Sequence, residues 1–231
     1  MKICAISDIH GKYDFTFKIE PCDLLLICGD IVPLDIQADL DSSLEWVNDF
    51  FIPWCKDLPC DKVIFIAGNH DKVMKIRTTE IKDLLKGQDK VVYLECETYE
   101  YKGYVIYGTP ICKIFGRWSF MEPQDMQMKR YERHLKNIGR IDIIMSHDTP
   151  YGISDVVLQT DCPWGDGTHI GNQALRFFVD AAQPKLMFHG HIHSSNHECE
   201  MCGKTEVYNV SLLDEKYELA YEPLYIEIDD R

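Results

Sequence analysis

The stretch Lys62-Val63-Ile64-Phe65-Ile66-Ala67-Gly68-Asn69-His70-Asp71 indicates most about the fold of this chain. Its first part is a run of β-branched and aromatic residues that ends at a glycine. This pattern is typical of a buried strand that enters a tight turn. The turn then presents an amide, an imidazole and a carboxylate in succession, which predicts polar chemistry at the end of this strand.

Four further apolar runs end in the same way. The runs 3–7, 24–28, 142–146 and 185–189 lead, in that order, into Asp8-Ile9-His10, Gly29-Asp30, His147 and Gly190-His191-Ile192-His193. Ligands of open α/β sheets bind at the carboxyl ends of the strands. The five runs therefore predict one polar site at one edge of a sheet.

Length and composition indicate an ordinary globular protein. A chain of 231 residues, 45% hydrophobic and 27% charged, can bury a full core as one domain, and we expect a single domain over residues 1–231. The formal net charge is -14, from 24 basic and 38 acidic residues. Such a surface repels polyphosphate, so we expect no stable nucleic-acid binding.

The chain shows no sign of export or of membrane insertion. Met1-Lys2 leads straight into the first apolar run, without the charged and apolar regions of a signal peptide, and no apolar stretch is long enough to span a bilayer. Several of the ten cysteines, such as Cys4 and Cys28, fall within predicted buried strands. We therefore expect reduced thiols in a cytoplasmic protein.

The remaining pattern predicts helices, strands and one long loop. Ser42 and Glu45 have the spacing of a capping box at the start of a helix. The other expected elements are an amphipathic piece at 13–19, helices at 79–86, 124–137 and 168–182, strands at 90–94 and 104–107, and hairpin strands at 206–210 and 224–228. The loop from Thr109 to Pro123 is long enough to suggest a function. Its aromatic residues could stack on a base or close the loop onto its own domain.

The polar residues at the strand ends form a set of metal ligands. Asp8 and His10, like His191 and His193, are two residues apart and so leave an extended strand on the same face. Carboxylate, amide and imidazole groups without cysteine suit Mn, Fe or Zn. The seven candidates are Asp8, His10, Asp30, Asn69, His147, His191 and His193. Seven are too many for one ion, whereas two ions ~3.5–4 Å apart that share one carboxylate would use them all.

These ordered motifs resemble those of the calcineurin-like metallophosphoesterases, over nearly the whole chain. The segments 165–184 and 208–211 are most similar to the small phosphodiesterase branch that includes the metallophosphoesterase-domain proteins. The resemblance implies an α/β (α+β) fold, a double β-sheet sandwich flanked by helices, with two metals at the strand ends. It implies a first ion on Asp8, His10, Asp30 and His193, and a second on Asp30, Asn69, His147 and His191. Mn²⁺ is the first choice for the pair, with Fe and Zn as alternatives.

The expected function is hydrolysis of a small phosphodiester, with a cyclic nucleotide among the candidate substrates. A hydroxide that bridges two cations would attack phosphorus in line. His70 would protonate the leaving group, with Asp71 fixing and charging its imidazole. Asn69 and His169 would contact the substrate phosphate.

Three other functions remain open. A phosphomonoesterase or phosphoprotein phosphatase of this superfamily would carry arginines where this chain has Ile31-Val32-Pro33-Leu34 and Ala67. A nuclease would need a basic track, which the acidic composition does not favour. A catalytically silent binding scaffold would show no metal and no turnover.

The sequence His197-x-Cys199-x-x-Cys202 is a weak zinc signal. One Cys-x-x-Cys without a second pair rarely makes a metal site, so we favour a hairpin that carries two thiols.

Overall fold

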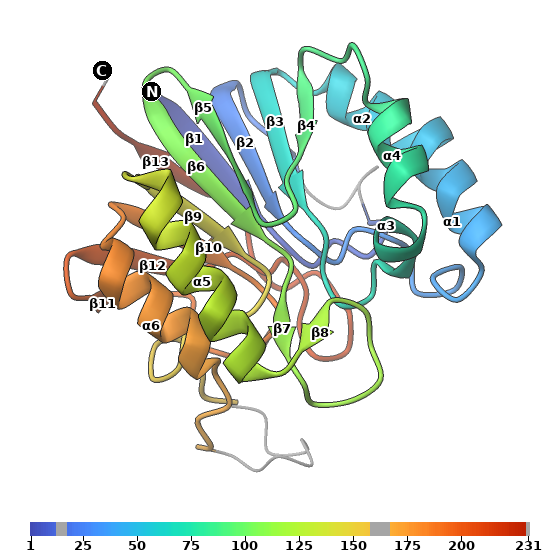
Figure 1. The fold of residues 1–231 in the computed structure, drawn as a ribbon. Coiled ribbons are helices and arrows are strands. Elements are labelled where there is room, and N and C mark those ends of the chain that lie inside the picture. Colours follow the sequence, from blue (N-terminus) through green and yellow to red (C-terminus); the bar gives the residue numbers. More distant parts are fainter. Residues whose placement is uncertain (13–17, 158–166, 230–231) are drawn as a thin grey trace.

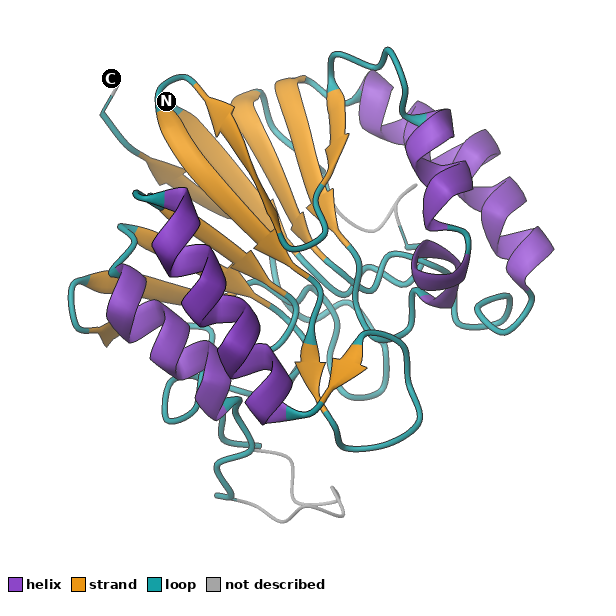
Figure 2. Ribbon diagram, viewed as in Figure 1, coloured by secondary structure: helices purple, strands orange, loops and turns teal. Residues whose placement is uncertain are grey.

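Two β-sheets face each other between two groups of helices (Figures 1 and 2). The computed structural model describes residues 1–12, 18–157 and 167–229. The first sheet has the strand order β13 (Leu224–Glu227), β1 (Lys2–Ile6), β2 (Cys22–Cys28), β3 (Cys60–Ile66) and β4 (Val91–Tyr93). The second has the order β11 (Glu200–Cys202), β12 (Thr205–Asn209), β10 (Leu186–His189), β9 (Ile143–Ser146), β6 (Tyr104–Thr109) and β5 (Glu97–Tyr101). A small third sheet pairs β7 (Cys112–Lys113) with β8 (Met121–Glu122).

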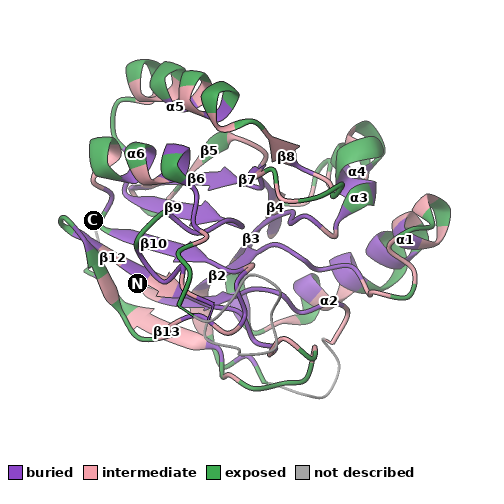
Figure 3. Cartoon of the chain, turned by 90° about the horizontal axis from the view of Figure 1, so that it is seen from below, coloured by how far each residue is buried: buried purple, intermediate pink, exposed green. Residues whose placement is uncertain are grey.

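Helices cover the outer face of each sheet. The first sheet carries α1 (Leu40–Trp46), the π-helical turn η1 (Val47–Phe51), α2 (Ile52–Asp57), α3 (Lys72–Ile76) and α4 (Thr78–Leu84). The second carries α5 (Gln124–Ile138) and α6 (Gln173–Ala182), whose outward faces are exposed in Figure 3. The expected double sandwich flanked by helices is confirmed.

The alternation of strand side chains explains these layers. In β1, Ile3 and Ala5 enter the core between the two sheets, whereas Cys4 and Ile6 enter the core between the first sheet and its helices. Because successive side chains of a strand point to opposite faces, a strand that is apolar throughout is buried on both sides.

Parallel pairing gathers the carboxyl ends of the strands at one edge. Strands β1, β2 and β3 are parallel, and so are β6, β9, β10 and β12. At this edge a bridge joins Ser7, just after β1, to Ser211, just after β12. The bridge brings the ends of the two sheets together, so polar residues from both sheets can share one site.

Several predicted elements differ from the observed ones. Asp39 caps α1, because its Oδ1 accepts the N–H groups of Asp41 and Ser42 at 3.0 Å, so the predicted capping box at Ser42 is wrong. Asn172 caps α6, so that helix begins later than predicted. The predicted amphipathic piece at 13–19 lies largely outside the described residues.

The predicted hairpin of the last two strands is also wrong. β13 pairs antiparallel with β1 in the first sheet, whereas β12 lies in the second sheet. The hairpin partner of β12 is β11, a three-residue strand that the sequence pattern did not reveal. Within the described ranges, no helix has the length and apolar character needed to cross a membrane.

Candidate metal centre

The seven predicted ligands converge at the shared edge of the sheets. Asp8 and His10 follow β1, Asp30 follows β2, and Asn69 follows β3. On the second sheet, His147 follows β9, and His191 and His193 follow β10. Asp8, Asp30 and His191 have φ angles of 54°, 52° and 73°, which are uncommon for residues other than glycine. Such backbone conformations concentrate at functional sites, where the surrounding structure maintains them.

The Asp8 side of the centre is fixed by a network that begins at Ser211. Ser211 Oγ donates to Asp8 Oδ2 at 2.8 Å, and His193 Nε2 lies 3.1 Å from Asp8 Oδ1. His193 Nδ1–H donates to the Asp214 carbonyl at 2.8 Å, which directs Nε2 toward the carboxylate. Burial alone would raise the pKa of Asp8, but His193 lowers it well below its usual range. Burial alone would lower the pKa of His193, but Asp8 raises it to about 9.

The Asp30 side is built in the same way. His147 Nδ1–H donates to the Cys28 carbonyl at 2.9 Å, so Nε2 faces Asn69 Oδ1 at 3.0 Å and Asp30 Oδ2 at 3.3 Å. Asp30 Oδ1 accepts the backbone N–H of His70 at 2.8 Å, which leaves Oδ2 free to point into the site. Against the effect of burial, Asp30 raises the pKa of His147 to about 10. The pKa of Asp30 is lowered in turn, chiefly by His147, although burial opposes the shift.

The surroundings of the buried His10 imidazole show whether this residue fits a cation site. Among the described residues, neither ring nitrogen has a hydrogen-bond partner, although both are buried. Burial lowers the pKa of His10 to about 4, so the ring is neutral. A neutral, buried and unpartnered imidazole needs a bound ion or water to avoid a large desolvation cost. His10 therefore fits a metal ligand.

Two groups of three donors have the spacing of metal sites. In each group the donor atoms lie within 4.8 Å of one another. The groups are Asp8, His10 and His193, and Asp8, Asp30 and His147. Asp30 Oδ2 also lies 3.7 Å from His10 Nε2, so this oxygen faces both groups. The centre fits a pair of cations that share a carboxylate.

A third group of donors was missed by sequence reasoning. It joins Cys112 to His147 and His191, again within 4.8 Å. Cys112 begins the short strand β7, which follows β6, and the end of β6 adjoins the end of β9. The strand that ends at Gly108 was recognised in the sequence. The sequence did not indicate that residues after this strand also reach the edge where the two sheets meet.

Asp71 does not orient His70, contrary to the prediction. The Asp71 carboxylate accepts the backbone N–H groups of Ile31, Val32 and Gly68 at 2.7–3.2 Å, which ties the turn after β2 to the turn after β3. Burial and the Asp30 charge raise the pKa of Asp71 to about 7. Adjacent residues direct their side chains differently, and this one faces the protein interior.

The partner of His70 is Gln37, which sequence reasoning missed. His70 Nδ1 lies 2.6 Å from Gln37 Oε1, and Gln37 Nε2 donates to the Leu34 carbonyl at 3.0 Å. This arrangement makes Nδ1 the donor to Gln37 and leaves Nε2 on the side of Asp30 Oδ2, 4.0 Å away. His70 therefore presents Nε2 to the centre.

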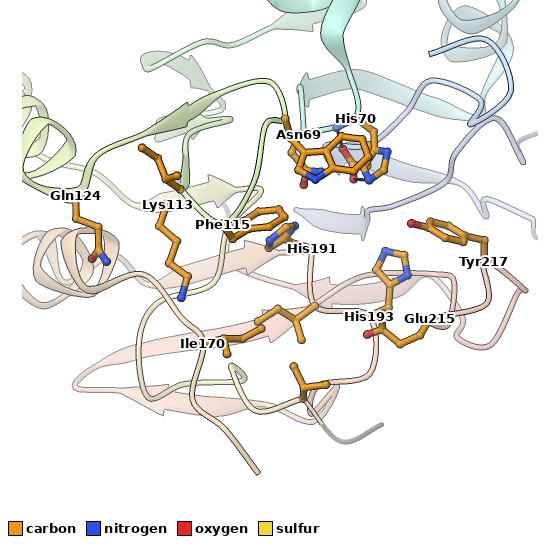
Figure 4. Close-up of a pocket in the computed structure, with 15 residues that line it drawn as sticks. Asn69, His70, Lys113, Phe115, Gln124, Ile170, His191, His193, Glu215 and Tyr217 are labelled. Carbon is orange, nitrogen blue, oxygen red and sulfur yellow. Dashed lines mark hydrogen bonds and ion pairs between the residues drawn. The ribbon is translucent and has the colours of Figure 1, made fainter. Parts of the chain in front are cut away.

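A cavity of about 580 Å³ opens from the centre (Figure 4). Aromatic rings lie at the end of the cavity nearest the candidate ligands. The ring centroid of Trp118 is 4.3 Å from that of His70, and the ring centroid of Phe115 is 5.0 Å from that of His191. Both residues line the cavity, whereas Phe120 is buried in the core. In the segment from Thr109 to Pro123, closure onto its own domain is confirmed for Phe120, whereas stacking of an aromatic ring on a base stays a prediction. One aromatic residue closes it onto the domain and two face the cavity.

His169 is not placed for the predicted phosphate contact. Its Nδ1 pairs with Asp155 Oδ1 at 2.6 Å, and its side chain is half exposed. Among the described residues that line the cavity, Ile170 is present and His169 is not.

The His197, Cys199 and Cys202 cluster forms no metal group among the described residues. Cys202 lies on β11 of a two-stranded hairpin, and both thiols are free. His197 Nε2–H donates to the His193 carbonyl at 2.8 Å. The predicted hairpin is confirmed by the antiparallel pairing of β11 with β12.

Comparisons with known proteins agree with this geometry. Human metallophosphoesterase domain-containing protein 1 is 23% identical over 247 residues, which cover 98% of this chain and 71% of that protein. An uncharacterized protein of Methanocaldococcus jannaschii, MJ1162, is 25% identical over 219 residues, which cover 91% of this chain and 88% of that protein. The first similarity matches the branch expected from the motifs.

A solved structure shares the fold. The protein TT1561 of Thermus thermophilus superposes with a TM-score of 0.63 at 14% identity, covering 90% of this chain and 88% of that one. The family model of the calcineurin-like phosphoesterases matches residues 1–195. The chain belongs to the calcineurin-like phosphoesterase family.

Proposed function

We propose that this protein is a dimetal phosphodiesterase that hydrolyses a small organic phosphodiester, with cyclic nucleotides among the candidate substrates. The observation that carries the proposal is the convergence of seven donor side chains from the ends of two sheets at one edge, with His10 buried and without a hydrogen-bond partner among the described residues. The membership of the family supports metal-dependent hydrolysis of a phosphoester.

In this proposal each cation has four protein ligands and Asp30 is shared. The first ion would be held by Asp8, His10, Asp30 and His193, and the second by Asp30, Asn69, His147 and His191. When bound, such a pair lowers the pKa of water and neutralises phosphate oxygens. Mn²⁺ is our first candidate for the pair, with Fe and Zn as alternatives, since carboxylate, amide and imidazole donors without cysteine suit all three metals.

His70 is the proposed proton donor to the leaving group. Gln37 holds Nδ1, so a proton on Nε2 faces the centre, where the leaving oxygen would depart. Trp118 packs against the imidazole and limits its rotation. An alkoxide leaving group needs this proton, whereas p-nitrophenolate does not.

The charge of the cavity favours a diester over a monoester. Among the described residues that line it, Lys113 is the one lysine or arginine, and its ammonium already donates to the Gly171 carbonyl at 3.3 Å. A monoester dianion would gain from further cations, such as a bidentate arginine. A diester carries one negative charge and leaves room for an organic group on each side.

The setting we propose is a reducing compartment, in line with the expected cytoplasmic location. All nine described cysteines are free thiols, and five of them are fully buried. Because disulfides persist mainly in oxidising compartments, free thiols in this number favour a reducing one.

A substrate panel tests the proposal. Metal analysis comes first, followed by Mn²⁺-supplemented assays on bis-p-nitrophenyl phosphate, p-nitrophenyl phosphate, 2′,3′- and 3′,5′-cyclic nucleotides and a phosphopeptide. We expect diesters to be hydrolysed faster than monoesters. Faster hydrolysis of the monoester or the phosphopeptide would favour a phosphatase, and metal-replete protein without turnover would favour a binding scaffold.

A further inference from the structure

We propose that the thiolate of Cys112 is a ligand of the ion at the His147–His191 position, and that it makes this position prefer Zn²⁺, Fe²⁺ or Co²⁺ over Mn²⁺. The inference rests on the proposed dimetal centre, which assigns a cation to this position. It adds a soft donor to a set that otherwise consists of oxygen and nitrogen.

The fold holds Cys112 against the centre. Its backbone N–H donates to the Phe120 carbonyl at 2.9 Å, and its carbonyl accepts from Gln127 Nε2 at 3.0 Å. The next residue is also fixed, because Lys113 N–H donates to Asp148 Oδ2 at 2.8 Å. Cys112 is fully buried, so its side chain cannot turn out to solvent.

The thiol faces nitrogen donors and has little else to bind. Sγ lies within 4.8 Å of a ring nitrogen of both His147 and His191. The thiol donates a weak hydrogen bond to the Pro110 carbonyl at 3.7 Å. Sulfur and imidazole ligands at 2.3 Å and 2.0–2.1 Å from zinc lie roughly 3.5–4 Å apart in a tetrahedral site. The spacing of the group is therefore compatible with one ion bound by all three residues after small adjustments.

The alternative is a buried cysteine that packs as a small hydrophobic residue. Cys28 represents that case: it is fully buried, its Sγ donates to the Phe188 carbonyl at 3.6 Å, and it belongs to no metal group among the described residues. Cys112 differs from Cys28 in facing two ligand imidazoles. This position beside two candidate ligands favours metal binding by the Cys112 thiolate.

Binding through sulfur changes the proton balance and the metal preference. The S–H bond breaks, a sulfur–metal bond forms, and the proton leaves to the buffer, with no change in oxidation state. Thiolates select soft and borderline ions, and affinity for divalent ions rises from Mn²⁺ through Fe²⁺ and Co²⁺. Mn²⁺ gains least from such a ligand, so the two positions of the centre should differ in selectivity.

The test is the absorption spectrum of protein loaded with Co²⁺. We expect a thiolate-to-cobalt charge-transfer band in the near ultraviolet for the unmodified protein and for Cys28→Ser, and no such band for Cys112→Ser. In a chelator competition, Cys112→Ser should lose at least the roughly 10- to 100-fold in Zn²⁺ affinity that is typical when a residue supporting a metal ligand is removed. Its Mn²⁺ affinity should change far less.

Each other outcome overturns the inference. Two bound cobalt ions without the band would show that Cys112 is not a ligand, while the dimetal centre stands. A band that persists in Cys112→Ser would belong to another thiol. Failure to bind cobalt at all would remove both the inference and the proposed function. If Cys112→Ser does not fold, the spectrum of the unmodified protein and of Cys112→Ala still decides.

Discussion

Replacement of Gln37 by leucine should lower the rate by weakening the control of His70, not by removing metal. Gln37 Oε1 accepts from His70 Nδ1 at 2.6 Å, and Gln37 Nε2 is anchored on the Leu34 carbonyl at 3.0 Å. Leucine has a similar size and no acceptor. The imidazole would then lose the bond that fixes its orientation and keeps Nε2 toward the centre.

The size of the effect follows from the bond that is lost. A hydrogen bond to a charged group contributes about 1.5–3 kcal/mol when buried. Gln37 is partly exposed, so water can replace part of this bond, and we take about 1–1.5 kcal/mol. At 1.36 kcal/mol per tenfold, this predicts a loss of about 5- to 12-fold in kcat/KM.

The assay compares two leaving groups. Gln37→Leu should show the loss on an alkyl phosphodiester and little loss on bis-p-nitrophenyl phosphate, because p-nitrophenolate departs without a proton. His70→Ala should follow the same pattern with a larger loss, roughly 10²–10⁴ on the alkyl ester. Asp35→Asn, an exposed change in the same turn, should leave both rates unchanged.

A double mutant refines the comparison. If Gln37 acts through His70, then Gln37→Leu should cost nothing more in a His70→Ala background. Equal losses on both substrates, or a further loss in that background, would refute the role given to Gln37. If His70→Ala lost the same factor in rate on the alkyl phosphodiester and on bis-p-nitrophenyl phosphate, His70 would not be the general acid.

The remaining predictions concern the metal sites and the turns that hold them. A Cβ at Gly68 would lie 2.1 Å from Asp30 Oδ1, so Gly68→Ala should displace the shared carboxylate and lower the metal content measured by mass spectrometry; two retained ions would contradict this. The pKa values of about 10 for His147 and about 9 for His193 mean that both imidazoles are protonated at neutral pH without metal, so loading should release at least about two protons per chain. Calorimetry in buffers of different ionisation enthalpy measures this release, and metal affinity should rise with pH through this range; affinity that is independent of pH would refute it. In Asp71→Asn, an amide group replaces the carboxylate that accepts buried backbone N–H groups. The variant should therefore lose about 1–3 kcal/mol of unfolding free energy, measured by denaturant titration. The pKa of Asp71 is raised to about 7 in the folded state. Its contribution to the stability of the metal-free protein is therefore present below the pKa of the unfolded chain and is lost as the pH rises through about 7. Asp71→Asn should lack this pH dependence.

The strand ends could be predicted from sequence because local pattern and fold agree there. Runs such as 62–67 are buried on both faces, and the polar residues that follow them have no place in the core. Parallel pairing then brings those residues to one edge without any further information. For the same reason, the candidate ligand residues can be predicted from the sequence alone.

The errors arise where a contact depends on residues far apart in the chain. The pairing of β13 with β1 joins the two ends of the described chain, and no local pattern announces it. Asp71 adjoins His70 in sequence but faces the turn after β2, whereas Gln37 reaches His70 from more than thirty residues away. Cys112 approaches His147 from the two-residue strand β7, which is too short to show a periodic pattern in the sequence.

The measurement that tests the central claim most directly is anomalous diffraction from a crystal soaked in Mn²⁺. We predict two anomalous peaks, roughly 3.5–4 Å apart, on either side of Asp30 Oδ2. One peak should lie among Asp8, His10 and His193, and the other beside Asn69, His147 and His191. A single peak after a soak that saturates both positions with Mn²⁺, or no peak in protein that hydrolyses phosphodiesters, would contradict a paired-cation centre.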